Sequence, residues 1–121
     1  MADSMTHTDL GTCDHLWRAV DTGAVALAET LAPGIAFELR EIRLHISAAV
    51  VAAESFTATA DAHAGAGYDV LHLSQAMTGE TDLIQTYNPG EKRFHASDEI
   101  DFAFTNSNTN TWGLEVIYKL L

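Results

Sequence analysis

Cysteine, basic side chains and long apolar runs are all scarce in this chain of 121 residues. Its single cysteine, Cys13, has no partner for an internal disulfide, and a redox pair or a cysteine-based zinc site also needs a second cysteine. No stretch approaches the roughly 18 consecutive apolar residues that span a bilayer. The first residues carry acids and no Lys or Arg, so we expect neither a signal peptide nor a transit peptide.

Negative charge dominates the composition. The chain has 6 Lys and Arg residues against 17 Asp and Glu residues, which gives a formal net charge of −11 at pH 7. This balance disfavours nucleic acid as a partner, because neutralising phosphates requires a surface rich in Lys and Arg. Anionic membranes are disfavoured for the same reason. An acidic surface suits a partner protein that offers basic patches.

The length is that of one domain, large enough to bury its own core without metals or disulfides. Residues 1–14 are polar and show no apolar period, so we expect an extended N-terminal arm that lies on another chain. Residues 15–121 are expected to form a single β-sandwich domain. Deleting such an arm is predicted to weaken assembly and to leave the stability of the domain almost unchanged.

Turn signals recur at even intervals after the arm and leave runs of about 6–12 residues between them, the spacing of a sandwich. They fall at Asp21–Gly23, Ala32–Gly34, Gly65–Gly67, Thr78–Glu80, Asn88–Gly90, Ser97–Glu99 and Asn106–Asn110. In Ile100–Thr105, as in other runs, every second residue is large and apolar, which is the period of a strand. The pattern predicts an all-β fold, an antiparallel β-sandwich of about eight or nine strands in two packed sheets.

Two features refine this prediction. The apolar parity changes within Ala36–Ile46, which indicates a bulge or a strand that bends between two sheets. A helix is the competing interpretation of Ala24–Leu31 and of the alanine-rich Ser47–Glu54. Because both runs are short, we interpret the first as a strand and the second as a loop or one helical turn. The predicted core consists of Phe37, Leu39, Ile42, Leu44, Phe56, Val70, Leu71, Leu73, Ile84, Ile100, Phe102, Phe104, Leu114, Val116 and Tyr118.

Catalytic signatures are not found in the sequence. The chain has six histidines, but none are paired as H-x-H or H-x₃-H, and no H-E-x-x-H helix is present. Nucleophile elbows and phosphate-binding glycine loops are also missing. The acids around Asp98 precede a strand, where adjacent carboxylates usually form a solvated cap. We therefore expect no enzyme activity, no catalytic residue, no cofactor and no metal.

The C-terminal third carries a resemblance. Asp98–Lys119 reads as a strand, an Asn/Thr tip and a return strand, and Tyr68–Ser74 and Thr81–Ile84 add further strands. Together they resemble small β-sandwich virion proteins of tailed bacteriophages, which serve as capsid decoration (cement) subunits or minor head proteins. The resemblance covers about residues 35–121. It implies a jelly-roll-like fold, the major capsid protein as partner, homotrimers, and a place on the capsid surface after synthesis in the host cytoplasm.

A second function stays open, a non-catalytic carbohydrate-binding module. Trp112 and Tyr87, with the Asn/Thr loop beside Trp112, would supply its ligand face. Trp112 would stack on sugars if exposed, although packing over the end of the sandwich is the simpler interpretation. The residues predicted to bind a partner are Met5, Leu10, Asn108, Asn110 and Trp112, with Leu10 as the anchor of the arm.

Overall fold

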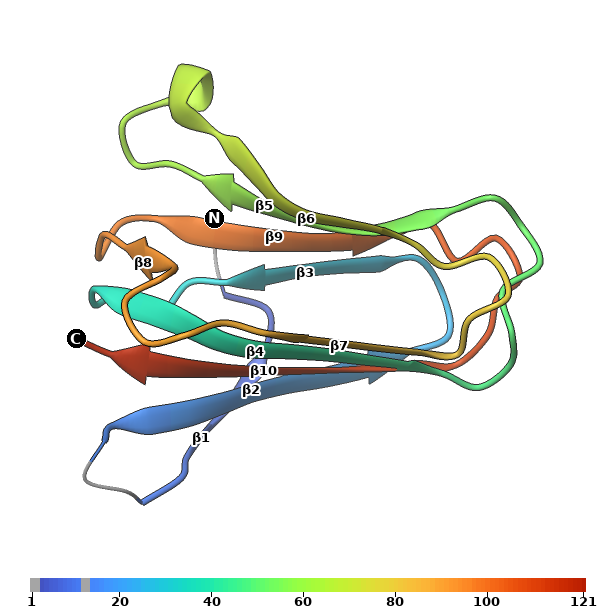
Figure 1. Cartoon of the computed structure of the whole chain (residues 1–121), viewed down its shortest axis with the longest axis horizontal. Coiled ribbons are helices and arrows are strands. Elements are labelled where there is room, and N and C mark those ends of the chain that lie inside the picture. Colours follow the sequence, from blue (N-terminus) through green and yellow to red (C-terminus); the bar gives the residue numbers. More distant parts are fainter. Residues whose placement is uncertain (1–2, 12–13) are drawn as a thin grey trace.

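Two antiparallel β-sheets packed face to face form the structure, a computed structural model that describes residues 3–11 and 14–121 (Figure 1). One sheet has the strand order β1-β2-β10-β4-β7, with β8 paired to the start of β4, and the other has the order β3-β9-β5-β6. The elements are β1 (Thr6–Asp9), β2 (Leu16–Gly23), β3 (Leu27–Leu31), β4 (Phe37–Ile46), β5 (Ser55–Asp61), the 3₁₀ turn η1 (Ala66–Tyr68), β6 (Val70–Ala76), β7 (Asp82–Thr86), β8 (Arg93–Phe94), β9 (Glu99–Phe104) and β10 (Trp112–Leu120).

The strand order is that of a jelly roll. Without β1 and β8, the two sheets read β2-β10-β4-β7 and β3-β9-β5-β6, so the chain crosses between the sheets in two interleaved Greek keys. The predicted all-β sandwich and its jelly-roll topology are confirmed. The additional strands are β1, in the segment expected to be an arm, and the two-residue β8.

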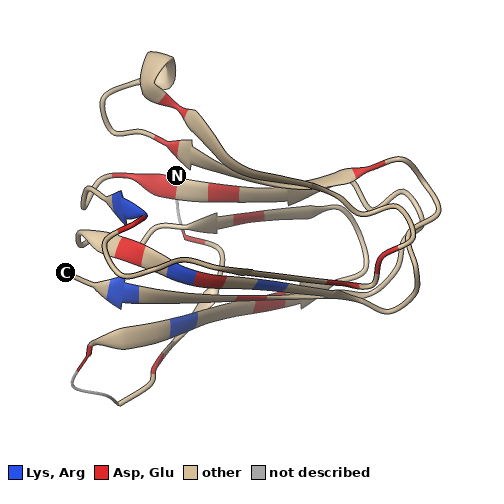
Figure 2. Cartoon of the chain, in the orientation of Figure 1, with Lys and Arg blue, Asp and Glu red and all other residues tan. Residues whose placement is uncertain are grey.

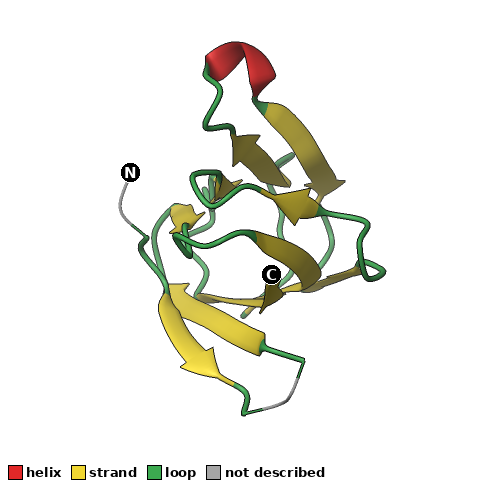
Figure 3. Ribbon diagram, turned by 90° about the vertical axis from the view of Figure 1, so that its left-hand side faces the viewer, coloured by secondary structure: helices red, strands yellow, loops and turns green. Residues whose placement is uncertain are grey.

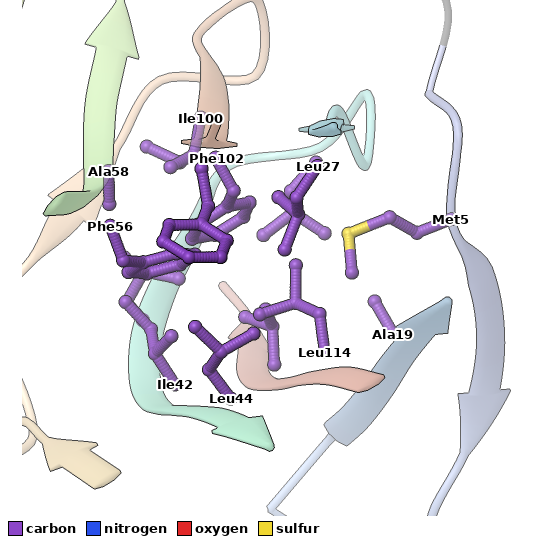
Figure 4. Close-up of a cluster of buried hydrophobic side chains, with 14 of the residues drawn as sticks. Met5, Ala19, Leu27, Ile42, Leu44, Phe56, Ala58, Ile100, Phe102 and Leu114 are labelled. Atoms are coloured by element: carbon purple, nitrogen blue, oxygen red, sulfur yellow. The ribbon is translucent and has the colours of Figure 1, made fainter. Parts of the chain in front are cut away.

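Alternate side chains of both sheets meet in one apolar core (Figure 4). Most of the predicted core is buried there: Phe37, Leu39, Ile42, Leu44, Phe56, Ile100, Phe102, Phe104, Leu114, Val116 and Tyr118. Leu27, Leu31, Ile46, Val50, Met77, Phe94 and Trp112 join them.

The prediction was wrong for three core residues, and Leu73 is only partly buried. Val70, Leu71 and Ile84 are 51%, 56% and 62% exposed. Each lies on β6 or β7, which are the edges of their sheets. Edge strands lack a neighbour on one side, so an apolar residue there stays exposed even where the alternation of the strand is regular.

The parity change in β4 is a β-bulge. Ile117 of β10 pairs with Glu41 and Tyr118 pairs with Leu39, so Arg40 is the extra residue. The interpretation of the two ambiguous segments is also confirmed. Leu27–Leu31 is strand β3, and residues 47–54 form a loop with one isolated bridge from Val50 to Thr78. Within the described ranges, no helix has the length and apolar character needed to cross a membrane.

The N-terminal segment belongs to the domain itself, which corrects the boundary expected at residue 14. β1 pairs with β2 of the same chain from Thr6↔Val20 to Asp9↔Trp17. Met5 is only 8% exposed and lies among the buried core residues, beside Ala19 in Figure 4. Leu10 is partly buried and lies outside the core cluster. Cys13 and residues 1, 2 and 12 lie outside the described residues.

Because Met5 fills part of the core, Met5→Ala is expected to lower the free energy of unfolding by about 2–3 kcal/mol, the cost of a buried cavity. Urea denaturation measures this loss. Leu10→Ala is the matched control from the same segment, because Leu10 is only partly buried and lies outside the core cluster, and it should cost less than about 1 kcal/mol. Equal stability of both variants would show that the N-terminal segment is not part of the core.

Candidate interaction surfaces

Trp112 forms a structural contact at the loop end of the sandwich. Its side chain is 3% exposed, and its Nε1–H donates a 2.8 Å hydrogen bond to the carbonyl of Val25. The indole lies over Gly23, where an added Cβ would stand 2.9 Å from the ring. The interpretation that Trp112 packs over the sandwich end is therefore confirmed, and the alternative of an exposed stacking platform is wrong.

The Asn/Thr loop after β9 holds the loop end together. Asn106 is buried, and its Nδ2 donates to the carbonyls of Val25 and Asn110 at 2.9 and 2.8 Å. The Oδ1 of Asn108 accepts bonds from the backbone N–H groups of residues 51 and 52. Asn110 Nδ2 donates to the carbonyl of residue 48 at 3.3 Å. The side chains of Asn108 and Asn110, which were predicted to bind a partner, thus make hydrogen bonds within the chain.

The proposed sugar-binding face is not assembled. Trp112 pairs with Ile46 at one end of β4, whereas the backbone of Tyr87 bonds to Arg40 of the same strand. Six residues of extended chain separate these points by about 20 Å. The ring of Tyr87 is partly buried against the core. The two aromatic rings therefore do not form one platform.

The first described residues lie along the edge of β3. Ser4 N–H donates to the carbonyl of Thr30 at 3.1 Å, and Ser4 Oγ accepts the Thr30 N–H at 2.9 Å. Asp3 accepts the N–H of Ala32 at 2.6 Å through Oδ2. We call residues Asp3–Met5 the N-terminal strap, because they connect the β3 edge of one sheet to β1 in the other. The strap covers one open side of the sandwich.

A histidine of β1 also holds Asp3, the first residue of the strap. His7 Nε2–H donates to Asp3 Oδ1 at 2.8 Å, and its Nδ1 lies 2.6 Å from the Tyr118 hydroxyl. Burial, and secondly the charge of Asp3, raise the pKa of Tyr118 to about 12. Because Tyr118 is 2% exposed and its phenol keeps its proton, the Asp3–His7–Tyr118 chain serves to fasten the strap to β10.

Two carboxyl groups meet beneath the strap. Glu29 points inward from β3, is 7% exposed, and accepts a 2.6 Å hydrogen bond from the Ser4 hydroxyl. Burial, and then a hydrogen bond shared with Asp21 of β2, raise the pKa of Glu29 to about 7. The sequence analysis missed this pair. Its only signal is the alternation Leu27-Glu29-Leu31, which places a carboxyl between two core residues.

The opposite end of the sandwich carries a histidine junction. The rings of His63 and His95 stack with centroids 3.9 Å apart. Asp98 Oδ1 accepts both the N–H and the Nδ1–H of His63, and Oδ2 accepts the N–H of His95. Burial alone would raise the pKa of Asp98, but these three bonds lower it. Asp98 thereby ties two loops together.

Strand β6 leaves a long edge open. It pairs with β5 alone among the described strands, and its seven residues, Val-Leu-His-Leu-Ser-Gln-Ala, include no charge and no proline. A bulge at His72 is its only local irregularity, since Ala58 pairs with Leu73 and Thr59 with Leu71. Natural edge strands are commonly protected by charges or prolines. The β6 edge has neither and presents exposed Val70 and Leu71.

The basic side chains lie on one side of the molecule, whereas acidic side chains occur on both sheets (Figure 2). The six basic residues lie on the six-stranded sheet or beside β8: Arg18, Arg40, Arg43, Lys92, Arg93 and Lys119. The strands of the other sheet carry Glu29, Asp61, Glu99 and Asp101 and no Lys or Arg. Burial, and then the charges of Asp69, Asp101 and Glu99, raise the pKa of Asp61. The four-stranded sheet is therefore the acidic side of the molecule.

A shallow groove of about 430 Å³ crosses the outer face of the six-stranded sheet. Gly113 leaves a gap between neighbouring side chains, and Val20, Ile84 and Glu115 line its walls. His45 and Asp82, paired at 2.8 Å, close one side. Within the described part of the chain, no three His, Cys, Asp or Glu side chains converge closely enough to hold a metal ion.

No model of a protein family matches the chain, and no curated protein is significantly similar to it.

The Asn106 contacts predict a large loss of stability for a loop residue. Asn106→Ala removes three internal hydrogen bonds and leaves an alanine at φ 55°, so unfolding should become easier by about 2–3 kcal/mol. Asn108→Ala, at an exposed position of the same loop, should cost less than about 1 kcal/mol. Thermal and urea unfolding measure both, and a reversed order would contradict the assigned role of Asn106.

Proposed function

We propose that this chain is a structural virion protein, a decoration subunit that binds the capsid surface of a tailed bacteriophage and stabilises the head lattice. The exposed β6 edge carries the proposal, because it offers unpaired backbone groups and apolar side chains to another protein. The jelly-roll topology supports it, since viral capsid proteins are among the proteins built on this fold.

The chemistry of the partner follows from the surroundings of β6. On the outer face of the sheet, Leu71 of β6, Thr59 of β5 and Asp101 of β9 lie in one row across the strands. An extended segment added to β6 would place its own side chains at the end of this row. An apolar residue there contacts Leu71, and Lys or Arg side chains reach the acidic face around Asp61 and Asp101.

A segment of the major capsid protein with this mixed apolar and basic character is the proposed occupant. Each such contact is small, but a lattice repeats it many times, and multivalency makes the bound layer strong. The proposal includes homotrimers, the arrangement that the resemblance implies for capsid three-fold positions. It also includes synthesis in the host cytoplasm followed by a place on the capsid surface.

The test uses the capsid protein encoded beside this chain in its genome, assembled into heads and sedimented with the purified protein. The wild-type chain is expected to pellet with the heads and to appear as trimers in light scattering. Leu71→Glu places a charge on the β6 edge and should weaken binding at least about tenfold, which is about 1.4 kcal/mol.

Ile84→Glu is the matched control, since it makes the same change at a 62% exposed residue on the edge strand of the other sheet. Its binding should stay at the wild-type level. Failure of the wild-type chain to bind assembled heads would contradict the function. Weaker binding by Ile84→Glu than by Leu71→Glu would place the contact on the other sheet.

A further inference from the structure

A cavity of about 290 Å³ opens between the six-stranded sheet and the β3–β4 loop. Its walls are His7 of β1, Trp17 of β2, Tyr118 and Leu120 of β10, and Pro33 and Ile35 of the loop. Figure 3 views the sandwich from this end, where the β1–β2 hairpin and the C-terminus lie. The cavity shares no residue with the β6 edge, so it is independent of the proposed function.

The walls include apolar side chains that the fold turns inward without covering them. Trp17 lies on the same face of β2 as the buried Ala19, and Leu120 lies on the same face of β10 as the buried Tyr118. Trp17 and Leu120 are nevertheless only partly buried where they pack against the core. Ile35 of the loop is 50% exposed. Because apolar surface in water is unfavourable, these walls favour a ligand that fills the space beside them.

One carboxylate of the N-terminal strap holds two of the walls. Asp3 Oδ1 accepts the Nε2–H of His7 at 2.8 Å, and Oδ2 accepts the N–H of Ala32, the residue before Pro33, at 2.6 Å. Asp3 Oδ1 also accepts the N–H of Met5 at 2.8 Å. The strap thereby joins β1 to the β3–β4 loop in the free chain. A cavity with walls already held in place loses little freedom when a ligand enters, which favours binding.

The polar groups at the cavity are bonded to one another. Both ring nitrogens of His7 have partners, because Nδ1 lies 2.6 Å from the Tyr118 hydroxyl and Nε2 bonds to Asp3. The oxygens of Asp3 already accept the three hydrogen bonds described above, and none of the six lining residues is Lys or Arg. A charged ligand would lose its hydration here without gaining a partner of opposite charge. The lining therefore selects a neutral ligand.

The shape and size of the lining favour an aromatic ring. Flat rings come from three neighbouring strands, as His7, Trp17 and Tyr118. Such rings attract another aromatic ring in offset or edge-to-face arrangements. An apolar cavity of about 150 Å³ is large enough to bind benzene. The cavity of about 290 Å³ therefore has room for a ring with a small substituent.

We propose that this cavity binds a small neutral aromatic molecule, with its ring in contact with Trp17 and Ile35. The ligand covers the apolar surface that the sandwich leaves open at this end. The Asp3–His7–Tyr118 chain gives the cavity a fixed polar side.

An NMR titration of the full chain with 4-methylphenol tests the proposal through the indole N–H resonances of its two tryptophans. The Trp17 resonance should shift and reach saturation, with a dissociation constant at or below about 1 mM. Trp112 is the internal reference, since it is buried and bonded to Val25 at the other end of the sandwich, and its resonance should stay in place. Trp17→Phe assigns the two signals by removing one of them.

Ile35→Glu places a charge in the wall and should weaken binding of 4-methylphenol at least about tenfold. Val25→Glu is the matched control, because it makes the same kind of change at a 71% exposed residue of the opposite end. It should keep the wild-type dissociation constant. Both positions are exposed, so neither variant is expected to disturb folding.

Two further probes test the chemical class of the ligand. The anion 4-methylbenzoate and the non-aromatic 4-methylcyclohexanol should each bind at least about tenfold more weakly than 4-methylphenol. Equal binding of 4-methylbenzoate would contradict a neutral ligand, and equal binding of 4-methylcyclohexanol would contradict an aromatic one. A Trp17 resonance that stays fixed, or that shifts without saturating, would overturn the site. Equal affinity of Ile35→Glu and the wild-type chain would also overturn it.

Discussion

The register of β10 between β2 and β4 holds the rest of the molecule in place. β10 pairs with both neighbours along nearly its whole length and buries Trp112, Leu114, Val116 and Tyr118 on one face. Because side chains alternate with a period of two, a slip of one residue would turn Glu115 and Lys119 into the core. The same register brings Trp112 over Gly23 and Tyr118 to His7. The contacts of Trp112 and Asn106 at the loop end and the strap along one side both depend on the position of β10.

The sequence predicts most of this fold because local alternation reports which face of a strand is buried. Ile100–Phe104 and the C-terminal strand are examples, and the change of parity in β4 correctly indicates the bulge at Arg40. Alternation says nothing about which strands lie side by side. Val70 and Leu71 look like core residues, yet they are exposed because β6 ends its sheet. Strand order depends on the whole topology and cannot be read from one segment.

The contacts of the N-terminal segment and of the loop end could not be predicted for a related reason. The segment lacks an apolar period because a single side chain, Met5, enters the core from it. Packing of Trp112 over the sandwich end is the simpler interpretation of the sequence, but nothing local identifies Gly23, far away in the sequence, as the residue that leaves room for its ring. The inward position of Glu29 is readable from Leu27 and Leu31. Its partner Ser4 is 25 residues away, and no local pattern brings the two together.

Carboxylates gathered on one side of the molecule repel one another, and this repulsion can be relieved in two ways. The four-stranded sheet carries its acids without a basic neighbour in its own strands, and the pKa of Asp61 is raised there by burial and by the charges around it. Glu29 experiences the same crowding in the interior. A proton relieves the crowding at Glu29, whereas the partly exposed acids of β5 and β9 can be neutralised by a basic protein surface. Binding of such a surface offsets the repulsion that raises the pKa of Asp61, so binding of a proton and binding of a basic surface oppose each other there. Glu29, which is 7% exposed, is out of reach of a partner's side chains, and there the crowding raises the pKa of the carboxyl instead.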